Sequence, residues 1–374
     1  MTGLLKDLMH DRADRLNQPV LDLAAITRAG ERRVRRRRIV GGASGLAAVV
    51  TLTALAPALF DGRDGGDDTN RTAVSEAAVL TWAAGDVIHA GDLTHQIGHD
   101  IHAFVATDRG YVLADPDGGV WSWTGGPAER VGTAMTDPSG SSAVLVAEGA
   151  WAGWMDPDHD EFVFLDQATG NVQRTPAATC GRDLDESPLR MFAIDGTTAY
   201  VRDARGIVTI DLVSGNVAVI GSVKAGTEIH DVEGGLILHS LSKDDLQATV
   251  ASRDLAADEP ALGVRGGDIS PGGTYVMSEN SATESDTFTL LRLSDGEELT
   301  PAVAKDYDFF LGYAWFDDDT YSAFGLRGTG GTSESSLSIE MLTCQVDAGS
   351  CQVSDEGPTD IENFEIPVGM HIGD

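Results

Sequence analysis

The chain has few cysteines and few basic residues. Only 3 of its 374 residues are cysteine, which excludes a disulfide-dense scaffold or an array of zinc sites. Lysine and arginine number 26 against 59 aspartates and glutamates, a net charge of −33. So acidic a protein is not expected to bind nucleic acid, because a polyanion repels it. Hydrophobic residues make up 42% of the chain, enough to build a core.

Common catalytic motifs are also missing. The sequence contains no G-x-S-x-G, no G-x-x-x-x-G-K-[ST], no H-E-x-x-H and no C-x-x-C. These patterns position serine nucleophiles, phosphate groups, zinc ions or redox-active thiols. We therefore predict no catalytic residues, no cofactor-binding residues and no metal ligands.

Charge is distributed very unevenly along the chain. Residues 1–38 carry ten basic and five acidic side chains, residues 39–60 carry neither, and residues 61–374 carry 16 basic and 54 acidic ones. Such a reversal of sign across an uncharged stretch requires a physical cause. The 22 arginines against 4 lysines, with abundant Ala and Gly, indicate a GC-rich bacterial genome of the actinobacterial kind.

The uncharged stretch has the length and composition of a transmembrane helix. Ile39–Phe60 spans 22 residues, and a helix of that length extends about 33 Å, enough to cross a hydrocarbon core of about 30 Å. Six arginines precede it, at Arg32, Arg33, Arg35, Arg36, Arg37 and Arg38. Because arginine is costly to translocate, we predict a signal anchor at the cell membrane, with a cytoplasmic N-terminus and an extracytoplasmic C-terminal domain.

A cleaved signal peptide is the main alternative to an anchor. Ala54-Leu55-Ala56 resembles a cleavage site. However, the region before the apolar stretch would be 38 residues long, and Pro57 would follow the cut. A buried helix of a soluble protein is less consistent with the flanking charges.

The segments around the predicted span complete the domain plan. We expect a basic cytoplasmic tail over residues 1–38, a flexible acidic linker over 61–75 and the exported domain over 76–368. The tail can lie against the anionic inner leaflet, or it can dock a cytoplasmic partner such as a sigma factor. The second reading makes the chain a transmembrane regulator, but His10 lacks the C-x-x-C pair of the zinc-binding anti-sigma pattern.

From residue 78 on, the predicted elements are short strands. Runs of four to seven apolar or β-branched residues alternate with turns of Gly, Asp, Asn or Ser. Turns ending in glycine recur at Gly118, Gly170, Gly215, Gly296 and Gly349, at spacings of 52, 45, 81 and 53 residues. Since 81 is about two periods, the repeat is about 40–50 residues long, and four strands per repeat predict a β-propeller.

One turn carries a family resemblance. The segment Asp268-Ile269-Ser270-Pro271-Gly272-Gly273-Thr274-Tyr275-Val276 resembles the S-P-D-G-x-Y-V turn of TolB-like and WD-repeat-like propellers, with Gly272 where Asp is usual. Residues 136–140 are a weaker copy, and residues 315–321 resemble the step from inner strand to turn in the same families. The resemblance implies an all-β propeller and no particular activity.

The strand count favours seven blades. Six repeats fit between about residues 101 and 355, and strands are left over at both ends, near residues 79–96 and 362–366. Pairing the two leftovers would make a composite seventh blade and remove the exposed edges of an open ring. A ring of six blades is the alternative.

The cysteines agree with export. Cys344 and Cys351 bracket a predicted hairpin turn, where facing side chains come within reach of a disulfide. We predict this disulfide, which would persist outside the membrane. A metal-binding pair is the alternative, but no further ligands lie nearby, and Cys180 has no predicted partner.

Two groups could be mistaken for metal sites. His89, His95, His99 and His102 lie on successive strands and turns without a matching carboxylate spacing, so we interpret them as polar hairpin residues. Residues 156–160 imitate the start of an EF-hand loop, but Glu161 and Gln167 stand where that loop needs Gly and Glu. We expect at most weak Ca²⁺ binding there.

Together these features predict a membrane-anchored extracytoplasmic propeller that binds a protein, a peptide or an envelope ligand. An extracytoplasmic hydrolase or lyase of the propeller type is the alternative, because propeller enzymes assemble their sites from separated repeats. Clustered carboxylates and histidines at a deep channel mouth would favour the enzyme.

Overall fold

The computed structural model describes residues 79–135, 143–179, 189–220, 227–240, 249–255, 260–264, 266–278, 288–299, 301–328, 337–358 and 364–370. Within these ranges, no helix is long and apolar enough to cross a membrane. The predicted span, its six arginines, the linker, Cys180 and the turn at 136–140 lie outside the described residues. Membrane topology therefore stays a prediction.

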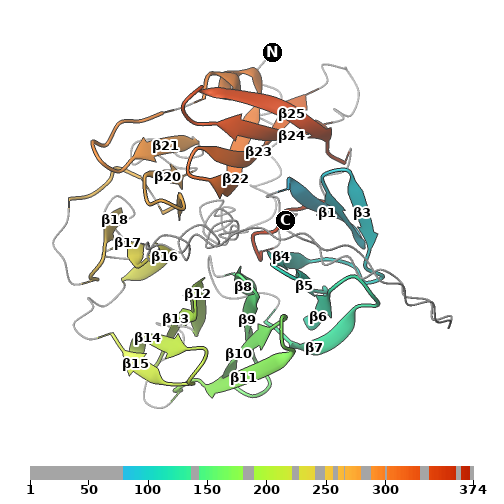
Figure 1. Cartoon of the computed structure of the whole chain (residues 1–374), viewed down its shortest axis with the longest axis vertical. Helices are drawn as coiled ribbons and strands as arrows, with labels where there is room; N and C mark the ends of the chain where they lie inside the picture. The colour runs from blue at the N-terminus through green and yellow to red at the C-terminus, as the bar shows by residue number, and fades with distance from the viewer. Residues whose placement is uncertain are drawn as a thin grey trace, which may run out of the picture.

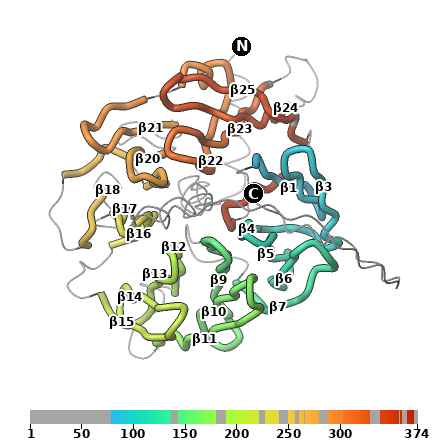
Figure 2. Tube along the Cα trace, in the orientation of Figure 1, coloured from blue at the N-terminus to red at the C-terminus, as the bar shows by residue number. Residues whose placement is uncertain are grey.

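Seven antiparallel sheets stand radially around a common centre, so the chain forms an all-β propeller of seven blades (Figure 1). The prediction of seven blades is confirmed, and the alternative of six is wrong. Each sheet has three or four described strands. Successive blades follow one another around the ring in chain order (Figure 2).

The strands of the first four blades run as follows. The first blade contains β26 (Phe364–Glu365), β1 (Thr81–Ala84), β2 (Val87–Ala90) and β3 (Leu93–Gln96). The second contains β4 (Ala103–Thr107), β5 (Gly110–Ala114), β6 (Gly119–Trp123) and β7 (Glu129–Thr133). The third contains β8 (Leu145–Glu148), β9 (Trp151–Asp156), β10 (Glu161–Asp166) and β11 (Asn171–Pro176), and the fourth β12 (Arg190–Asp195), β13 (Thr198–Asp203), β14 (Gly206–Asp211) and β15 (Val217–Val219).

The remaining three blades complete the ring. The fifth contains β16 (Glu228–Glu233), β17 (Leu236–Ser240) and β18 (Thr249–Ser252), and the sixth β19 (Asp268–Ile269), β20 (Tyr275–Ser278) and β21 (Thr289–Arg292). A short 3₁₀ helix, η2 (Ala302–Asp306), precedes the seventh blade. That blade contains β22 (Phe309–Asp317), β23 (Thr320–Gly328), β24 (Leu337–Gln345) and β25 (Ser350–Glu356).

The first blade is composite, as predicted. The C-terminal β26 pairs antiparallel with β1, with Phe364 opposite Ala84. Phe364 and Ile366 are both 0% exposed, and Phe364 packs edge-on against Phe324 of the seventh blade. The chain therefore closes the ring by joining its C-terminal strand to the first strands of the domain.

The segment after β26 extends this closure across two more blades. The Gly369 amide donates to the Phe104 carbonyl of β4 at 2.9 Å, and its carbonyl accepts from the amides of Val144 and Leu145 at 2.8 and 3.1 Å. Gly369 has a φ of +73°, and a Cβ atom there would lie 1.9 Å from the Leu145 carbonyl oxygen. Only glycine fits this position without displacing the backbone. The C-terminal segment thus connects the first three blades.

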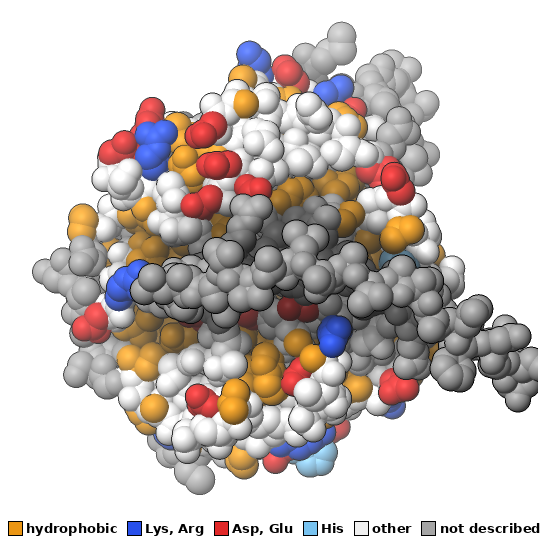
Figure 3. Space-filling model, in the orientation of Figure 1, with side chains coloured by type: hydrophobic (Ala, Val, Ile, Leu, Met, Phe, Trp, Pro, Cys, Tyr) orange, Lys and Arg blue, Asp and Glu red, His pale blue; other side chains and the backbone are white. Residues whose placement is uncertain are grey.

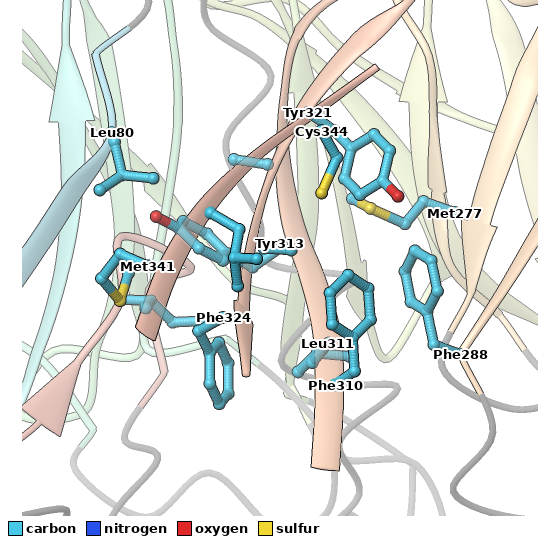
Figure 4. Close-up of a cluster of buried hydrophobic side chains, with 14 of the residues drawn as sticks. Leu80, Met277, Phe288, Phe310, Leu311, Tyr313, Tyr321, Phe324, Met341 and Cys344 are labelled. Carbon is cyan, nitrogen blue, oxygen red and sulfur yellow. The ribbon is translucent and has the colours of Figure 1, made fainter. Parts of the chain in front are cut away.

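Most of the core lies between blades rather than inside them, because each sheet buries both faces against its neighbours. The largest cluster joins the sixth, seventh and first blades (Figure 4). Phe288 lies 5.2 Å from Phe310 in an edge-on contact and 5.9 Å from Tyr321 in a stacked one. Burial on both faces explains the nearly continuous apolar runs of strands such as β5 and β22.

The glycine repeat is correct in period but wrong in one assignment. Gly170, Gly215 and Gly349 lie in turns between the third and fourth strands of their blades, whereas Gly118 lies between the second and third strands, β5 and β6. The equivalent turn of the second blade contains Thr124-Gly125, 45 residues before Thr169-Gly170, which is in turn 45 residues before Ser214-Gly215. The spacing of 52 arose from comparing different turns.

Cys344 and Cys351 face each other on β24 and β25. Their Cα atoms are 4.0 Å apart, and a disulfide joins the two sulfur atoms. Cys344 is fully buried at the edge of the largest core cluster.

We predict that the native protein carries this crosslink. Replacing both cysteines with serine should lower the free energy of unfolding by about 2 kcal/mol, because closing a short loop constrains the unfolded chain only modestly. Peptide mass spectrometry without reduction should recover the Cys344–Cys351 pair from the purified protein. Free thiols at both positions would contradict the prediction.

Candidate functional site

The innermost strand of each blade lines the centre of the ring, which makes these strands the first place to look for a site. They are β26, β4, β8, β12, β16, β19 and β22. Several carry buried ionisable side chains, namely Glu148, Arg190, Glu228, His230, Asp231, Glu233, Asp268 and Glu365. Buried ionisable groups are costly unless they are paired, so the contacts of Arg190, Glu228 and Asp231 indicate what these three groups do.

Arg190 and Glu228 form a buried ion pair between the fourth and fifth blades. The Arg190 guanidinium bonds the Glu228 carboxylate, and the two residues are only 6% and 8% exposed. Arg202, which faces Arg190 across β12 and β13, donates to the Thr227 carbonyl. Removing either charge would leave the other buried without its counter-charge, which is strongly destabilising. The pair therefore holds two blades together.

Two aspartates near the ends of inner strands bind the backbone of the next blade. Asp231 of β16 accepts a hydrogen bond from the Ile269 amide of the sixth blade at 2.6 Å. Asp195 of β12 accepts one from the Gly235 amide of the fifth blade at 3.0 Å. Hydrogen bonds to a carboxylate are stronger than those between neutral groups. These two acidic residues thus join blades.

Asp318 makes the most extensive contact of this kind. Its Oδ1 accepts from the Ser270 hydroxyl at 2.6 Å and the Gly272 amide at 2.7 Å, and its Oδ2 accepts from the Thr274 hydroxyl at 2.9 Å. Asp318 lies in the turn between β22 and β23, whereas residues 270–274 connect β19 to β20. The seventh blade therefore supplies a carboxylate to a turn of the sixth blade.

This contact explains the departure at Gly272 from the S-P-D-G pattern. A Cβ atom on Gly272 would lie 1.9 Å from Oδ2 of Asp318. An aspartate at position 272 would bring a carboxylate to this turn. Asp318 of the neighbouring blade already supplies one. Glycine at this position leaves room for it.

Other pairs of adjacent blades are also joined by polar side chains. Gln167 of the third blade donates to the Tyr111 carbonyl and to the Ser122 hydroxyl of the second, at 3.0 and 2.7 Å. The Trp82 indole of the first blade donates to Asp355 of the seventh at 3.1 Å. Acidic side chains are also spread over several blades of the face shown in Figure 3. Part of the acidic content therefore has a structural role, and part covers the surface.

The four histidines singled out from the sequence do not converge. His89 stacks on Trp82 with ring centroids 3.8 Å apart, His99 stacks on Trp121 at 3.5 Å, and His95 lies 4.7 Å from Trp123. Burial lowers the pKa of His89 and of His95, although Asp355 opposes the shift at His89. Among the residues that the structure describes, no three His, Cys, Asp or Glu side chains are grouped so as to hold a metal ion.

The EF-hand-like segment forms a closed hairpin turn between β9 and β10. The Asp156 carboxylate accepts from the Asp158 amide at 3.0 Å, from His159 Nδ1 at 3.0 Å and from Arg174 at 3.2 Å. Burial raises the pKa of Asp156, but these hydrogen bonds outweigh it and the pKa is lowered overall. A Ca²⁺ ion would have to compete with the Arg174 guanidinium for this carboxylate.

His239 is a buried histidine that sequence reasoning did not single out. It is 0% exposed on β17, and its Nε2 lies 3.2 Å from the Ser252 hydroxyl, which itself donates to the Asp254 carbonyl at 2.6 Å. The hydroxyl therefore accepts from Nε2–H, which assigns the neutral tautomer protonated at Nε2. Burial lowers the pKa of His239 to about 4.

We predict that His239 makes the domain less stable in mild acid. An unfolded histidine titrates near pH 6.5, so as the pH falls the unfolded chain takes up the proton first. The free energy of unfolding should therefore decrease between about pH 6.5 and about pH 4, by about 2–3 kcal/mol from this group. Chemical denaturation at pH 7.5 and pH 4.5 measures the loss. In His239→Gln the loss should be smaller, and an equal loss in both proteins would contradict the prediction.

Comparison with known proteins found solved structures that are only distantly similar to this chain. No protein-family model matches the chain, and no curated protein matches its sequence. A protein described as TolB from Agrobacterium tumefaciens is 14% identical with a TM-score of 0.36, covering 74% of this chain and 88% of that one. AztD from Citrobacter koseri is 13% identical with a TM-score of 0.39, covering 77% and 98%. The computationally designed Ika8 is 13% identical with a TM-score of 0.41, covering 74% and 92%.

Proposed function

We propose that the chain is a membrane-anchored, extracytoplasmic propeller that binds a protein, a peptide or an envelope ligand. The anchor is supported by the six arginines before the uncharged Ile39–Phe60 and by the excess of acidic residues after it. Binding is supported by the fold, because a closed ring is a rigid platform that presents many loops at fixed positions.

The proposal depends on one observation: charged residues on the inner strands bond neighbouring blades. Arg190, Glu228, Asp195 and Asp231 have the chemistry of catalytic groups, yet each bonds a neighbouring blade. A residue committed to such a contact is held in place by the fold and supports the ring. We therefore favour recognition over a hydrolase or lyase activity centred on these inner-strand groups.

A pull-down from envelope extract tests the binding function. The described ring closes between residues 79 and 370, so a soluble fragment of residues 75–374 contains all of it. A partner should be retained by this immobilised fragment and lost when an excess of the same fragment is added in solution as competitor. The same fragment should leave envelope polymers intact, and their cleavage would favour the enzyme instead.

Labelling of introduced thiols tests the topology. In a Cys180→Ser background, Thr69→Cys lies in the predicted linker and Thr27→Cys in the predicted tail. A membrane-impermeant maleimide added to intact cells should label position 69 and spare position 27. Labelling of position 27 alone would overturn the orientation.

A further inference from the structure

Among the residues that the structure describes, most blades end in an outer strand that has no partner along one edge, and most of these edges are protected. Unpaired strand edges invite pairing with other chains, and proteins discourage it with charged side chains or proline. The outer strand β7 contains Glu129 and Arg130, β11 contains Arg174 and Pro176, and β25 contains Asp355. Two outer strands of four-stranded sheets contain no such residue: β3, Leu93–Gln96, in which Leu93 is the one apolar side chain, and β15, Val217–Val219, which is apolar throughout.

The unprotected stretch extends well beyond β15 in the sequence. No charged residue occurs from Leu212 to Val223, within a region that carries 54 acidic side chains after residue 60. All three residues of β15 are exposed. Val219 is 53% exposed and Val213, in the preceding turn, is 77% exposed. These three valines, Val213, Val217 and Val219, form an apolar edge on an acidic domain.

The backbone of β15 is oriented to accept another strand. The Asp211 amide donates to the Asn216 carbonyl, and the Ile220 amide donates to the Ile207 carbonyl. Hydrogen-bonded residues alternate along an antiparallel pair, so Ala218 faces β14 while the amides and carbonyls of Val217 and Val219 point outward. The hydrogen-bonded ladder extends from residue 216 to residue 220, and β15 lies at the outer rim of the ring (Figure 1).

The side chains beside this edge continue a buried surface. Val217 lies opposite Ile210 and Val219 opposite Val208. Ile210 and Val208 are fully buried in the core between the third and fourth blades. A strand added along β15 would extend the same apolar face by one more row.

We propose that the free edge of β15 is a docking site for an extended peptide segment of a partner protein, which adds as a fifth strand to the fourth blade. This inference rests on the proposed binding function and assigns it a place on the ring. Strand addition of this kind gains affinity from main-chain hydrogen bonds and specificity from alternate side chains.

Charge indicates the chemistry of the occupant. Around an uncharged edge, the acidic domain attracts basic groups and repels acidic ones. The matching segment has apolar β-branched residues at alternate positions and lysine or arginine at its ends. A second copy of this chain does not fit, because the two acidic domains repel each other and so short an edge buries far less than the roughly 800 Å² per partner of a stable interface.

Selection from a displayed library of random ten-residue peptides tests the inference. The target is the fragment of residues 75–374, and the probes are the peptides that it enriches. We expect enriched sequences with alternating apolar residues and basic ends. The synthesised peptides should bind Val217→Lys/Val219→Lys at least tenfold more weakly than the original protein, because the two lysines place like charges beside the basic ends.

Two further variants separate backbone pairing from charge and from general damage. Val219→Pro removes an outward amide without touching the bonds to β14 and should also weaken peptide binding at least tenfold. Val353→Lys adds a charge at a valine that is 52% exposed on the outer strand β25, and it should leave affinity within twofold.

The outcomes distinguish this inference from the proposed function. Peptides whose affinity is unchanged in the β15 variants would overturn the docking site while leaving a binding function intact. A selection that enriches no peptide would also overturn it, whereas the binding function itself is decided by the envelope pull-down. The melting temperatures of all variants should equal that of the original protein. Equal values show that a variant loses peptide binding without losing its fold.

Discussion

A chain that ends at residue 363 is expected to lose the closed ring and to be recovered mainly as aggregate. The truncation removes Phe364, Ile366 and Val368, each 0% exposed. Burying such side chains contributes about 1.5–3 kcal/mol each, so the loss is about 5–9 kcal/mol. That is comparable with the whole stability of a domain, about 5–15 kcal/mol.

The lost hydrogen bonds add to this effect. Without β26 the edge of β1 is unpaired, and without Gly369 the amides of Val144 and Leu145 and the carbonyl of Phe104 lose their partners. Unpaired edges and buried unpaired backbone groups promote both unfolding and association. Truncation should therefore act on three blades at once.

Thermal unfolding measures the effect. At about 2 °C per kcal/mol for a domain of this size, any soluble truncated fragment should melt at least about 10 °C below the fragment of residues 75–374. A chain ending at Met370 retains every contact named here and is the matched control. If the chain ending at residue 363 melts within a degree or two of that control, the C-terminal segment does not close the ring.

The substitution Gly369→Val probes the same closure with a single residue. Its Cβ would collide with the Leu145 carbonyl, and the backbone there has the positive φ that valine disfavours. The melting temperature should fall by several degrees, in the same direction as truncation.

The ring itself could be predicted from the sequence because it depends on local signals that repeat. Turn glycines such as Gly170 and Gly215 recur at the period of a blade, and alternating apolar runs mark the strands between them. The composite first blade followed from counting leftover strands at both ends, since a ring leaves no room for an unpaired remainder. The hydrogen bonds of Gly369 to the second and third blades were not predicted. A glycine shortly after a strand gives no sign in the sequence of the distant blades that it contacts.

The contacts between blades were the part that sequence reasoning missed. Asp195, Asp231 and Asp318 are three among 59 acidic residues, and nothing in their immediate neighbours separates a carboxylate that holds a blade from one that faces water. The distinction depends on partners 38 to 48 residues away. Only the unusual glycine at position 272 marked such a contact, and its meaning required the turn of the next blade.

The substitution Gly272→Asp is therefore expected to destabilise the protein, although it restores the usual residue of the turn. The new Cβ would lie 1.9 Å from Oδ2 of Asp318, and the new carboxylate would be placed against an existing one in a partly buried seam. We expect a loss of about 2–4 kcal/mol, from overpacking together with like-charge repulsion. The substitution Asp318→Ala should cost a similar amount, because the Ser270 and Thr274 hydroxyls and the Gly272 amide lose their acceptor.

The double variant Gly272→Asp/Asp318→Ala decides whether the seventh blade stands in for the missing aspartate. With the space vacated, the aspartate introduced at position 272 can accept hydrogen bonds within its own turn, as the family pattern implies. The double variant should then be more stable than either single variant, a coupling of at least about 1 kcal/mol that denaturation of the four proteins would measure. Simple additivity of the two losses would show instead that the turn cannot use its own carboxylate, and that Gly272 reflects space alone.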